Sequence, residues 1–587
     1  MQTRNEIDEK YKWNIDAFKK EGKIEKAFEA FERIIADADK YNGKLNNPEV
    51  FFASHYDHKQ DEILIDQLCH YAFNLQNIDG SNLETKQLIE KIENMSAKVN
   101  KAYAYLEPQM SKLSIKYLKE LLKDKRSKNI ENQIKRLIIS KNHRIDEKTS
   151  ETIAKLSKSF NDTESIYDIL TNLEMTFDDV VDSTGKAHPM SEAEFLKLIK
   201  STDRILRKNT LTGLMNGYKK YNQTITALYT KDVKHNVDFA RLYNFNTYLE
   251  KKLFDYVPEK VFKNNIAVVE KHIPVLHDFI KTLKASSNIS DFAYYDLFED
   301  NKIDTKISIE QGQQIMLEAL APLGADYIEK VKYKLSDQSI DYLPHKNKAS
   351  GAYSYGVHGG KNLILMNWAY NFGAVSTLCH EMGHCINDAY YNPEQPYEKF
   401  GITTFLAEIA STVNEILLNQ HMLKNCAESD KTYYLKNFLN NVRATIFRQT
   451  LFTEFELFVY SSIENEVPLT NEDLNNKYYE LSQKYYGDSC VLPEELKYEW
   501  SRIPHFYSPY YVFAYSTGLL IAIMIANRIL KDNSYSKKYI HFLKNGRDKS
   551  PVDILNEIGI DLTKENAFDE SFEFIKKQLE EFKSLCK

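Results

Sequence analysis

Residues 375–388, VSTLCHEMGHCIND, decide how the rest of the chain is interpreted. Drawn as a helix at about 100° per residue, the stretch places apolar side chains on one side and polar side chains on the other. The apolar side carries Val375, Leu378, Cys379, Met382, Cys385 and Ile386, and the polar side carries His380, Glu381, His384, Asn387 and Asp388. Cys379 and Cys385 are therefore predicted to be core residues rather than metal ligands.

His380 and His384 are one helical turn apart, so their imidazoles can converge on one ion. Glu381 is rotated far enough to miss the ion but can reach a water molecule bound to it. The three residues form an HExxH motif, in which two histidines hold zinc and the glutamate acts as a general base. A surface helix that carries histidines by chance is the alternative, and the placement of all three residues on one polar side argues against it.

The third ligand of a catalytic zinc site is expected on the next helix, because such a site needs three protein ligands and one open position. Residues 404–417, TFLAEIASTVNEIL, predict that helix, with Glu408 and Glu415 two turns apart on its polar stripe. The spacing favours Glu408 as the ligand and Glu415 as the acceptor for a ligating imidazole. Glu415 remains the alternative ligand, because Asn414-Glu415 resembles the dipeptide that supplies it in thermolysin-like peptidases. Gly383, without a side chain, would let another helix approach closely.

Residues 351–368, GAYSYGVHGGKNLILMNW, interrupt the helical pattern. Alternation at 353–357, a turn at Gly359-Gly360 and a short apolar strand at 363–366 predict a β-hairpin. One interpretation is a structural ribbon packed on helices. The other is an exposed strand edge that pairs with an extended peptide.

Residues 502–518, RIPHFYSPYYVFAYSTG, bring one histidine and four tyrosines together between His505 and Tyr515. Amide hydrolysis passes through an oxyanion, and His and Tyr are suitable hydrogen-bond donors to it. An aromatic core with a satisfied histidine is the alternative, and the residues alone favour it.

The composition excludes several classes of protein. The chain has 587 residues, of which 19 are Gly and 14 are Pro. So few turn-forming residues argue against collagen, low-complexity disorder and turn-dense all-β folds. The net charge is -7, from 77 basic and 84 acidic residues, so no nucleic-acid partner is expected.

Cysteine usage and the apolar segments predict a cytoplasmic protein. The six cysteines show no CxxC spacing and do not read as a disulfide framework. The first residues, MQTRNEIDEKYKWN, lack the apolar region of a secretory signal. The longest apolar run, residues 518–526, has about half the length of a membrane span. We expect it to form a buried core helix, with no membrane partner.

Residues 1–345 predict one helix after another, because apolar residues recur at helical spacing. No low-complexity linker separates domains, and the turn at 185–189 is a weak boundary. We therefore expect an N-terminal helical lobe at residues 1–190 and a domain at 191–587 that contains the HExxH site.

HEMGH, FLAEIASTVNE and RIPHFYSPYYVFAYSTG, in this order, strongly resemble oligoendopeptidase F, within the thimet-oligopeptidase-type zinc metallopeptidases. YKWNID at 11–16, STDRILR at 201–207 and the hairpin extend the resemblance over nearly the whole chain. It implies a mainly α, zincin-like (neurolysin-like) fold with a small β-ribbon and a deep substrate channel between lobes. Such a channel admits short unfolded peptides and excludes folded proteins.

The resemblance also implies a role for each site residue in a zinc metalloendopeptidase with one Zn²⁺ per chain. The metal ligands would be His380, His384 and Glu408, the general base Glu381, and the transition-state donors His505, Tyr511 and Tyr515. Tyr510 is a rival to the two tyrosines. Short peptides would be the substrates, and no motif indicates an oligomeric state.

Asn387 departs from the family pattern, which commonly has a further histidine three residues after the second ligand. The change puts the tuning of the site in doubt, but it does not exclude catalysis.

Two other functions stay open. One is a non-catalytic helical peptide-binding protein with a relic zinc site. The other is a zinc carboxypeptidase, which would need a cation such as Arg502 or Lys361 to capture a peptide terminus.

Overall fold

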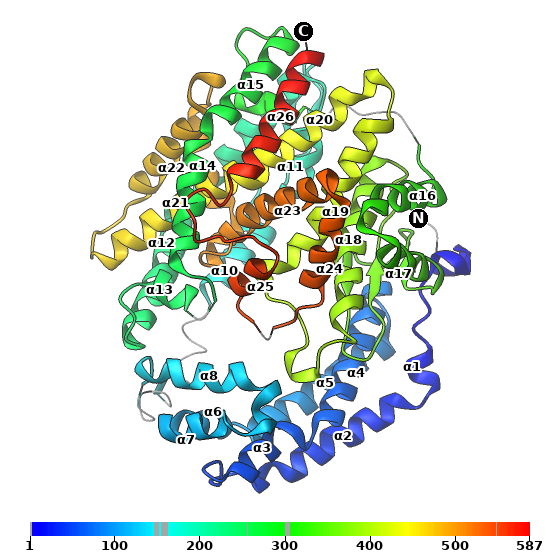
Figure 1. Ribbon diagram of the computed structural model, residues 1–587. Helices are drawn as coiled ribbons and strands as arrows, with labels where there is room; N and C mark the ends of the chain where they lie inside the picture. Colours follow the sequence, from blue (N-terminus) through cyan, green and yellow to red (C-terminus); the bar gives the residue numbers. More distant parts are fainter. Residues whose placement is uncertain are drawn as a thin grey trace. The chain divides into compact units, whose positions relative to one another are not determined.

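The computed structural model describes residues 3–145, 149, 152–153, 162–254, 256–299, 306–547 and 549–586. Within these residues helices predominate, and the strands are short (Figure 1). The predicted mainly α class with a small β-ribbon is confirmed. The low Gly and Pro content accounts for this, because these two residues weaken helices most.

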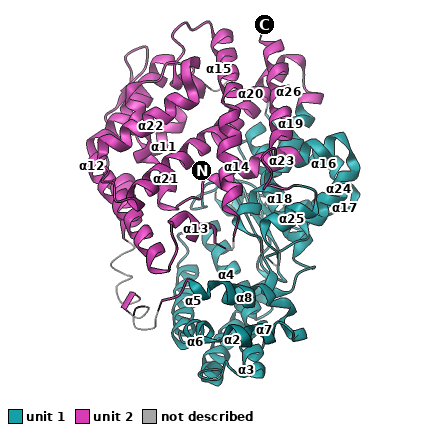
Figure 2. Ribbon diagram, turned by 60° about the vertical axis from the view of Figure 1, so that its left-hand side comes forward, with its two compact units in different colours: residues 1–142, 304–422, 525–560 teal, residues 143–303, 423–524, 561–587 magenta. Residues whose placement is uncertain are grey.

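The chain divides into two compact units, each assembled from three separated segments (Figure 2). Unit 1 comprises Met1–Asn142, Asp304–Met422 and Ile525–Ile560, and unit 2 comprises His143–Ile303, Leu423–Met524 and Asp561–Lys587. This packing does not follow the expected division into residues 1–190 and 191–587. The division into an N-terminal helical lobe and a domain with the HExxH site stays a prediction.

Unit 1 contains the helix that carries the HExxH motif and the three-stranded sheet. Its helices are α1 (Ala17–Lys20), α2 (Lys23–Asp37), α3 (Pro48–Tyr56), α4 (Lys59–Ile78), α5 (Leu83–Ala102), α6 (Leu106–Lys112), α7 (Ile115–Leu121), α8 (Glu131–Ile139), α16 (Ile309–Leu320), α17 (Ala325–Ser336), α18 (Phe372–Tyr391), α19 (Thr404–Asn425, up to Met422), α24 (Ser536–Leu543) and α25 (Pro551–Glu557). Its strands are β3 (Ile340–Asp341), β4 (Tyr353–Tyr355) and β5 (Leu363–Leu365).

Unit 2 contains the tyrosine-rich stretch near residue 510. Its helices are α10 (Thr163–Ile169), α11 (Glu192–Leu198), α12 (Arg204–Leu242), α13 (Tyr248–Leu253), α14 (Glu259–Lys271), α15 (Ile273–Ser287), α20 (Glu428–Val442), α21 (Arg448–Glu464), α22 (Asn471–Tyr486), α23 (Phe513–Lys531, up to Met524) and α26 (Asp569–Leu585). Its strands β1 (Val180–Val181) and β2 (Ala187–His188) pair antiparallel.

The predicted hairpin at residues 351–368 is confirmed, because β4 and β5 pair antiparallel. The strand order is β3-β5-β4, with β3 parallel to β5, so β4 lies at the edge of the sheet. Buried Leu363 and Leu365 of β5 pack with Trp13 and Ile78. The short strands β1, β2 and β3 correct the expectation of helices throughout residues 1–345. Two-residue strands carry too little alternation to be recognised in a sequence.

Helix α18 begins where the Asn371 side chain accepts a hydrogen bond from the Ala374 amide, a cap worth about 1 kcal/mol. Its six predicted apolar side chains are fully buried, the two cysteines included. Gly383 meets α19 directly: a Cβ there would lie 2.6 Å from the Ala410 carbonyl oxygen and 2.6 Å from the Ser411 Cα. The expected close approach of a second helix at Gly383 is therefore confirmed.

Asn414 locks the two helices together. Its Nδ2 donates to the Cys379 carbonyl of α18 at 3.1 Å, and its Oδ1 accepts from the Tyr327 hydroxyl of α17 at 3.0 Å. These groups are buried, so each bond also avoids the cost of an unsatisfied polar atom, about 1–3 kcal/mol. α17, α18 and α19 thus form a rigid frame for the histidines.

Helix α23 is long and apolar enough to cross a membrane by length and composition, with 78% of its most apolar window buried within the protein. The residues from Leu519 to Ala526 are all buried. The predicted core helix at residues 518–526 is confirmed.

Candidate metal centre

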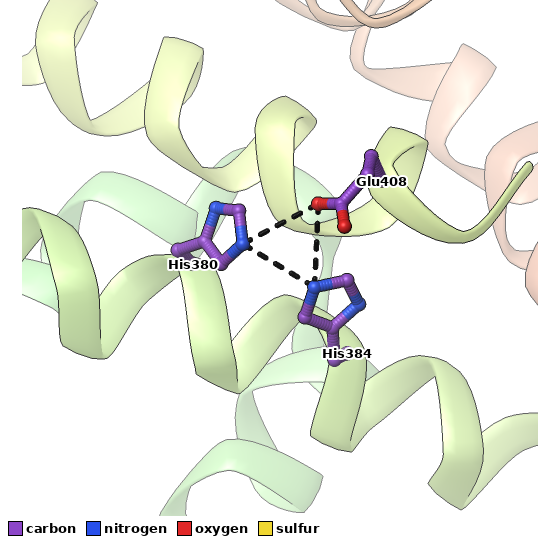
Figure 3. Close-up of side chains that lie close together, drawn as sticks. All are labelled: His380, His384 and Glu408. Carbon is purple, nitrogen blue, oxygen red and sulfur yellow. Dashed lines mark hydrogen bonds and ion pairs between the residues drawn. The ribbon is translucent and has the colours of Figure 1, made fainter. Parts of the chain in front are cut away.

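His380, His384 and Glu408 come together between α18 and α19 and are called the metal cluster below (Figure 3). The two Nε2 atoms are 3.3 Å apart. Glu408 Oε2 lies 3.4 Å from the Nε2 of His380 and 3.5 Å from that of His384. The residues that the spacing singled out thus converge in one place.

These distances fit zinc. Ligand atoms at about 2.0–2.1 Å from a tetrahedral Zn²⁺ are about 3.3–3.4 Å from one another, as the geometry of a tetrahedron requires. The donor set, two imidazoles and one carboxylate, is also that of catalytic zinc sites. The three side chains keep 27%, 23% and 40% exposure, so solvent can reach the cluster.

Two neighbours orient the cluster. Glu415 Oε1 lies 3.3 Å from His380 Nδ1. A proton on Nδ1 donated to this carboxylate leaves the Nε2 lone pair directed at the cluster, which is the tautomer a metal needs. Ser411 Oγ donates to Glu408 Oε2 at 3.0 Å and holds that carboxylate in place. Glu415 thus occupies the outer position that the helical spacing favoured, rather than the alternative position of a ligand.

The carboxylates and imidazoles of the cluster stabilise each other's charged forms. Burial lowers the pKa of His380, but the hydrogen bond with Glu415 and the nearby carboxylates raise it to about 9. Burial raises the pKa of Glu408, but the hydrogen bond with His384 and the two imidazoles lower it to about 2. A divalent cation would compete with protons for the same atoms, so metal affinity would fall in acid.

Glu381 lies beside the metal cluster on α18 and is only 7% exposed. Burial raises the pKa of its carboxyl, against the opposing effect of the two imidazoles. A carboxyl group whose pKa is moved toward neutrality can both accept and return a proton, which is what a general base in hydrolysis must do.

The edge strand β4 packs against α18 in the same unit. Among the described residues no strand pairs with its outer edge. Helix α4 holds the strand in place: His70 Nε2 bonds the Tyr355 carbonyl at 3.0 Å, and the Tyr353 hydroxyl donates to Asn74 Oδ1 at 2.9 Å. A firmly held strand with one open edge can receive an extended peptide.

Residues 504–515, called the donor segment below, lie in unit 2. His505 is exposed on the short helix η13 (Pro504–Tyr507), and Tyr511 and Tyr515 are half-buried. The rings of Tyr511 and Tyr515 are 5.1 Å apart, and those of His505 and Tyr515 are 6.1 Å apart. The three predicted donors thus form one group within unit 2.

Tyr510 does not belong to that group. Its side chain is 1% exposed, and its ring packs against Tyr460 at 4.9 Å and Phe262 at 5.6 Å. Tyr510 is therefore a core residue, whereas Tyr511 and Tyr515 are half-buried.

Asn387 and Asp388 are both buried, at 2% and 5% exposure, although they were expected on one polar side with the histidines. The Asn387 amide donates to the Leu543 carbonyl of α24 at 2.9 Å, so it serves helix packing. Burial raises the pKa of Asp388 to about 6. A polar side chain need not face solvent, because neighbouring elements that the local sequence does not reveal can cover it.

The two cations considered for carboxypeptidase activity already have partners. Arg502 makes a two-pronged contact with Glu192, at 3.1 and 2.8 Å. Lys361 donates to the Asp337 carbonyl at 3.0 Å. Capture of a peptide carboxylate by Arg502 would have to break its ion pair.

Comparison with known proteins agrees with this site. The sequence profile described as "Peptidase family M3" matches residues 197–574, and one described as "Oligopeptidase F" matches residues 110–177. The chain belongs to peptidase family M3. It is thus a peptidase, and the family implies a metal-dependent one. The resemblance found in the sequence is confirmed.

Relatives of this M3 peptidase cover its whole length. Oligopeptidase PepF of Bacillus subtilis is 32% identical over 99% of this chain and 88% of its own. An oligoendopeptidase F homolog of Borreliella burgdorferi is 30% identical over 100% of both chains. The crystal structure of oligoendopeptidase-F from Enterococcus faecium matches with a TM-score of 0.73 and 26% identity over 96% of this chain and 98% of its own. A Chlamydophila abortus structure matches with a TM-score of 0.90 and 27% identity over 100% of both chains.

Sequence reasoning missed several supporting residues of this M3 peptidase. No role was predicted for Ser411, although its position three residues after Glu408 allows the hydrogen bond between them. Glu456 lies outside every motif, and its one local signal is that it is a polar residue within the otherwise apolar run FELFVY.

Proposed function

We propose that this M3 peptidase is a zinc endopeptidase that hydrolyses short, unfolded oligopeptides at internal bonds. The metal cluster carries the proposal, because its three ligand atoms have the chemistry and the mutual distances of a tetrahedral zinc site with one open position. The curated relatives named oligoendopeptidase F support the choice of substrate.

In this proposal His380, His384 and Glu408 hold one Zn²⁺ per chain. When bound, zinc supplies a Lewis acid that polarises a carbonyl and lowers the pKa of a water molecule. Glu381 takes a proton from the attacking water and delivers one to the leaving amine, and its buried position and raised pKa suit it to both transfers. Glu415 keeps His380 in the ligating tautomer.

His505, Tyr511 and Tyr515 donate hydrogen bonds to the oxyanion in this proposal. Their grouping within unit 2 and the exposure of His505 support the assignment, together with the match of the surrounding motif to the family. Donors aimed at the developing charge stabilise the transition state more than the substrate, so they act on kcat.

The open edge of β4 aligns the substrate in this proposal. An extended peptide that adds to the edge forms main-chain hydrogen bonds irrespective of its side chains, which suits a broad set of short peptides. A folded protein cannot offer a free extended strand in this way.

The deciding experiment is digestion of a short, internally quenched peptide that is blocked at both ends. The purified protein is assayed with and without a chelator, and the products are identified by mass spectrometry. We expect internal cleavage that the chelator abolishes and added zinc restores. A blocked peptide that stays intact while a free one loses residues from its C-terminus would support the carboxypeptidase alternative.

A protein that binds one zinc yet cleaves neither peptide would overturn the proposal and support the peptide-binding alternative.

We also propose that the protein resides in the cytoplasm, as its cysteine pattern predicts, and cell fractionation with an antibody tests this.

A further inference from the structure

The donor segment contains a strained turn directly before Tyr511. The Tyr511 amide donates to the Ser508 carbonyl at 3.1 Å, with Pro509 and Tyr510 between them. Tyr510 has φ +51°, in the left-handed region that the third residue of a type II turn requires and that glycine usually occupies. A tyrosine with this backbone conformation needs support from its surroundings.

Glu456 of α21 supplies that support. Its Oε1 accepts a hydrogen bond from the Tyr510 amide at 2.8 Å, and its side chain is fully buried. The ring of Tyr510 packs against Tyr248, Phe262 and Tyr460, so residues of unit 2 hold both the backbone and the side chain of the turn.

A second buried anchor lies just beyond Tyr515. Ser516 Oγ accepts hydrogen bonds from Thr450 of α21 and Asn265 of α14, each at 3.1 Å. All three side chains are fully buried. Tyr511 and Tyr515 therefore lie between two fixed points, and Glu456 provides the one next to Tyr511.

We propose that Glu456 is a positioning residue for the peptidase reaction: by accepting the Tyr510 amide hydrogen bond, it fixes the turn that places the Tyr511 hydroxyl. This inference rests on the proposed role of Tyr511 as a donor to the oxyanion. Glu456 itself touches no reacting atom in this scheme. Its contribution is to keep the donor at one distance and angle, and an error of about 1 Å in such a position can cost about 10²-fold in rate.

The chemical state of Glu456 makes the test selective. Burial raises its pKa to about 8, against the lowering effects of the Tyr510 amide and Lys252. The group is thus largely a neutral acid at pH 7, and a glutamine reproduces its size, its neutrality and its acceptor oxygen. A leucine keeps the bulk and the apolar contacts but removes the acceptor.

The experiment compares Glu456→Gln and Glu456→Leu, with kcat and KM normalised to bound zinc. We expect Glu456→Leu to lower kcat by about 10²-fold with little change in KM or zinc content. Glu456→Gln should restore kcat to near the wild-type value. Thr453→Val is the matched control, because Thr453 is an equally buried residue of α21. Its hydroxyl bonds the Gln449 carbonyl of the same helix and, among the described residues, no other group.

A double-mutant cycle with Tyr511→Phe separates positioning from general weakening of the fold. If Glu456 acts through Tyr511, Glu456→Leu should have little further effect on kcat in the Tyr511→Phe background. Additive losses, an equal loss in Thr453→Val, or wild-type kcat in Glu456→Leu would each overturn the inference. No effect of Tyr511→Phe by itself would instead overturn the donor role on which the inference rests.

Glu456→Asp provides a second variant if the leucine protein does not fold. It keeps the carboxyl group but withdraws it from the Tyr510 amide by one methylene. We expect a lower kcat with unchanged zinc content, and a wild-type kcat would overturn the inference.

Discussion

The metal cluster and the donor segment are built in opposite ways. The metal cluster lies on two regular helices, where a one-turn spacing sets the distance between the histidines and Gly383 sets the distance to the third ligand. The donor segment lies on short turns, and a buried carboxyl group on another helix holds the left-handed residue among them. Regular helices thus fix a metal site through their own geometry, whereas an irregular segment depends on particular contacts from the core.

The two regions should therefore respond differently to substitution. Changes in the metal cluster should alter metal content and activity together. Changes in the donor segment should alter the rate and leave the metal in place.

The largest effect is expected for Glu381→Gln, beside the metal cluster. Loss of the general base should lower kcat by about 10²–10⁴-fold, while the metal stays, because Glu381 is not one of the three converging ligands. Turnover assays and elemental analysis of the same sample measure both quantities. His384→Ala is the contrasting variant, which should lose metal and activity together. Near-normal activity in Glu381→Gln would remove Glu381 from the mechanism.

Tyr511→Phe should have the next largest effect and tests the other side of the comparison. Removal of one oxyanion donor costs about 10²–10³-fold in kcat, and KM and zinc content should change little. The control is Tyr510→Phe, which removes a tyrosine hydroxyl from the preceding residue, whose side chain is buried in the core. This variant should keep kcat within a few fold of the wild-type value. The comparison fails if the two variants lose the same activity or if Tyr511→Phe loses zinc.

The same contrast explains how much the sequence could predict. The helical period placed His380 and His384 together and favoured Glu408 over Glu415 as the third ligand. The missing side chain of Gly383 indicated the contact between the two helices. The sequence pattern could not show that Tyr510 points into the core. The orientation of Tyr510 accompanies a positive φ and a hydrogen bond from its amide to Glu456, which is 54 residues away in the chain.

Local sequence patterns also could not predict all of the strand pairing or the burial of polar side chains. The hairpin of β4 and β5 was visible because its turn and alternation are local. β3 was not, because its parallel pairing with β5 joins residues that no turn connects. The burial of Asn387 likewise follows from α24, which contributes the carbonyl that it bonds from a distant part of the chain.

Glu415→Ala should weaken the metal cluster without removing a ligand. The carboxylate that orients His380 is lost, and loss of such an outer partner lowers metal affinity by about 10–100-fold. Competition with a chromogenic chelator measures the affinity, and kcat at saturating zinc should stay near the wild-type value. Glu415→Gln keeps an acceptor oxygen without the charge, so its metal affinity should lie between those of the wild-type protein and Glu415→Ala. Unchanged affinity in both variants would show that α18 alone orients the histidine.

The smallest effect concerns stability and the support of the donor segment. Burial raises the pKa of Glu456 from 4.5 to about 8, so between these values the folded protein binds a proton that the unfolded chain has released. The proton on Glu456 therefore stabilises the folded state fully below about pH 4.5. This stabilisation is lost as the pH rises toward 8, and the free energy of unfolding falls by about 1.4 kcal/mol per pH unit in between. Between pH 6 and pH 7, denaturant unfolding should therefore show the wild-type protein losing about 1.3 kcal/mol more stability than Glu456→Gln, whose residue 456 exchanges no proton. Other titrating groups are shared by the two proteins and cancel in the difference. Equal losses in both would mean that the Tyr510 amide is held by an ionised carboxylate, and the glutamine variant would then lack the charge that supports the turn.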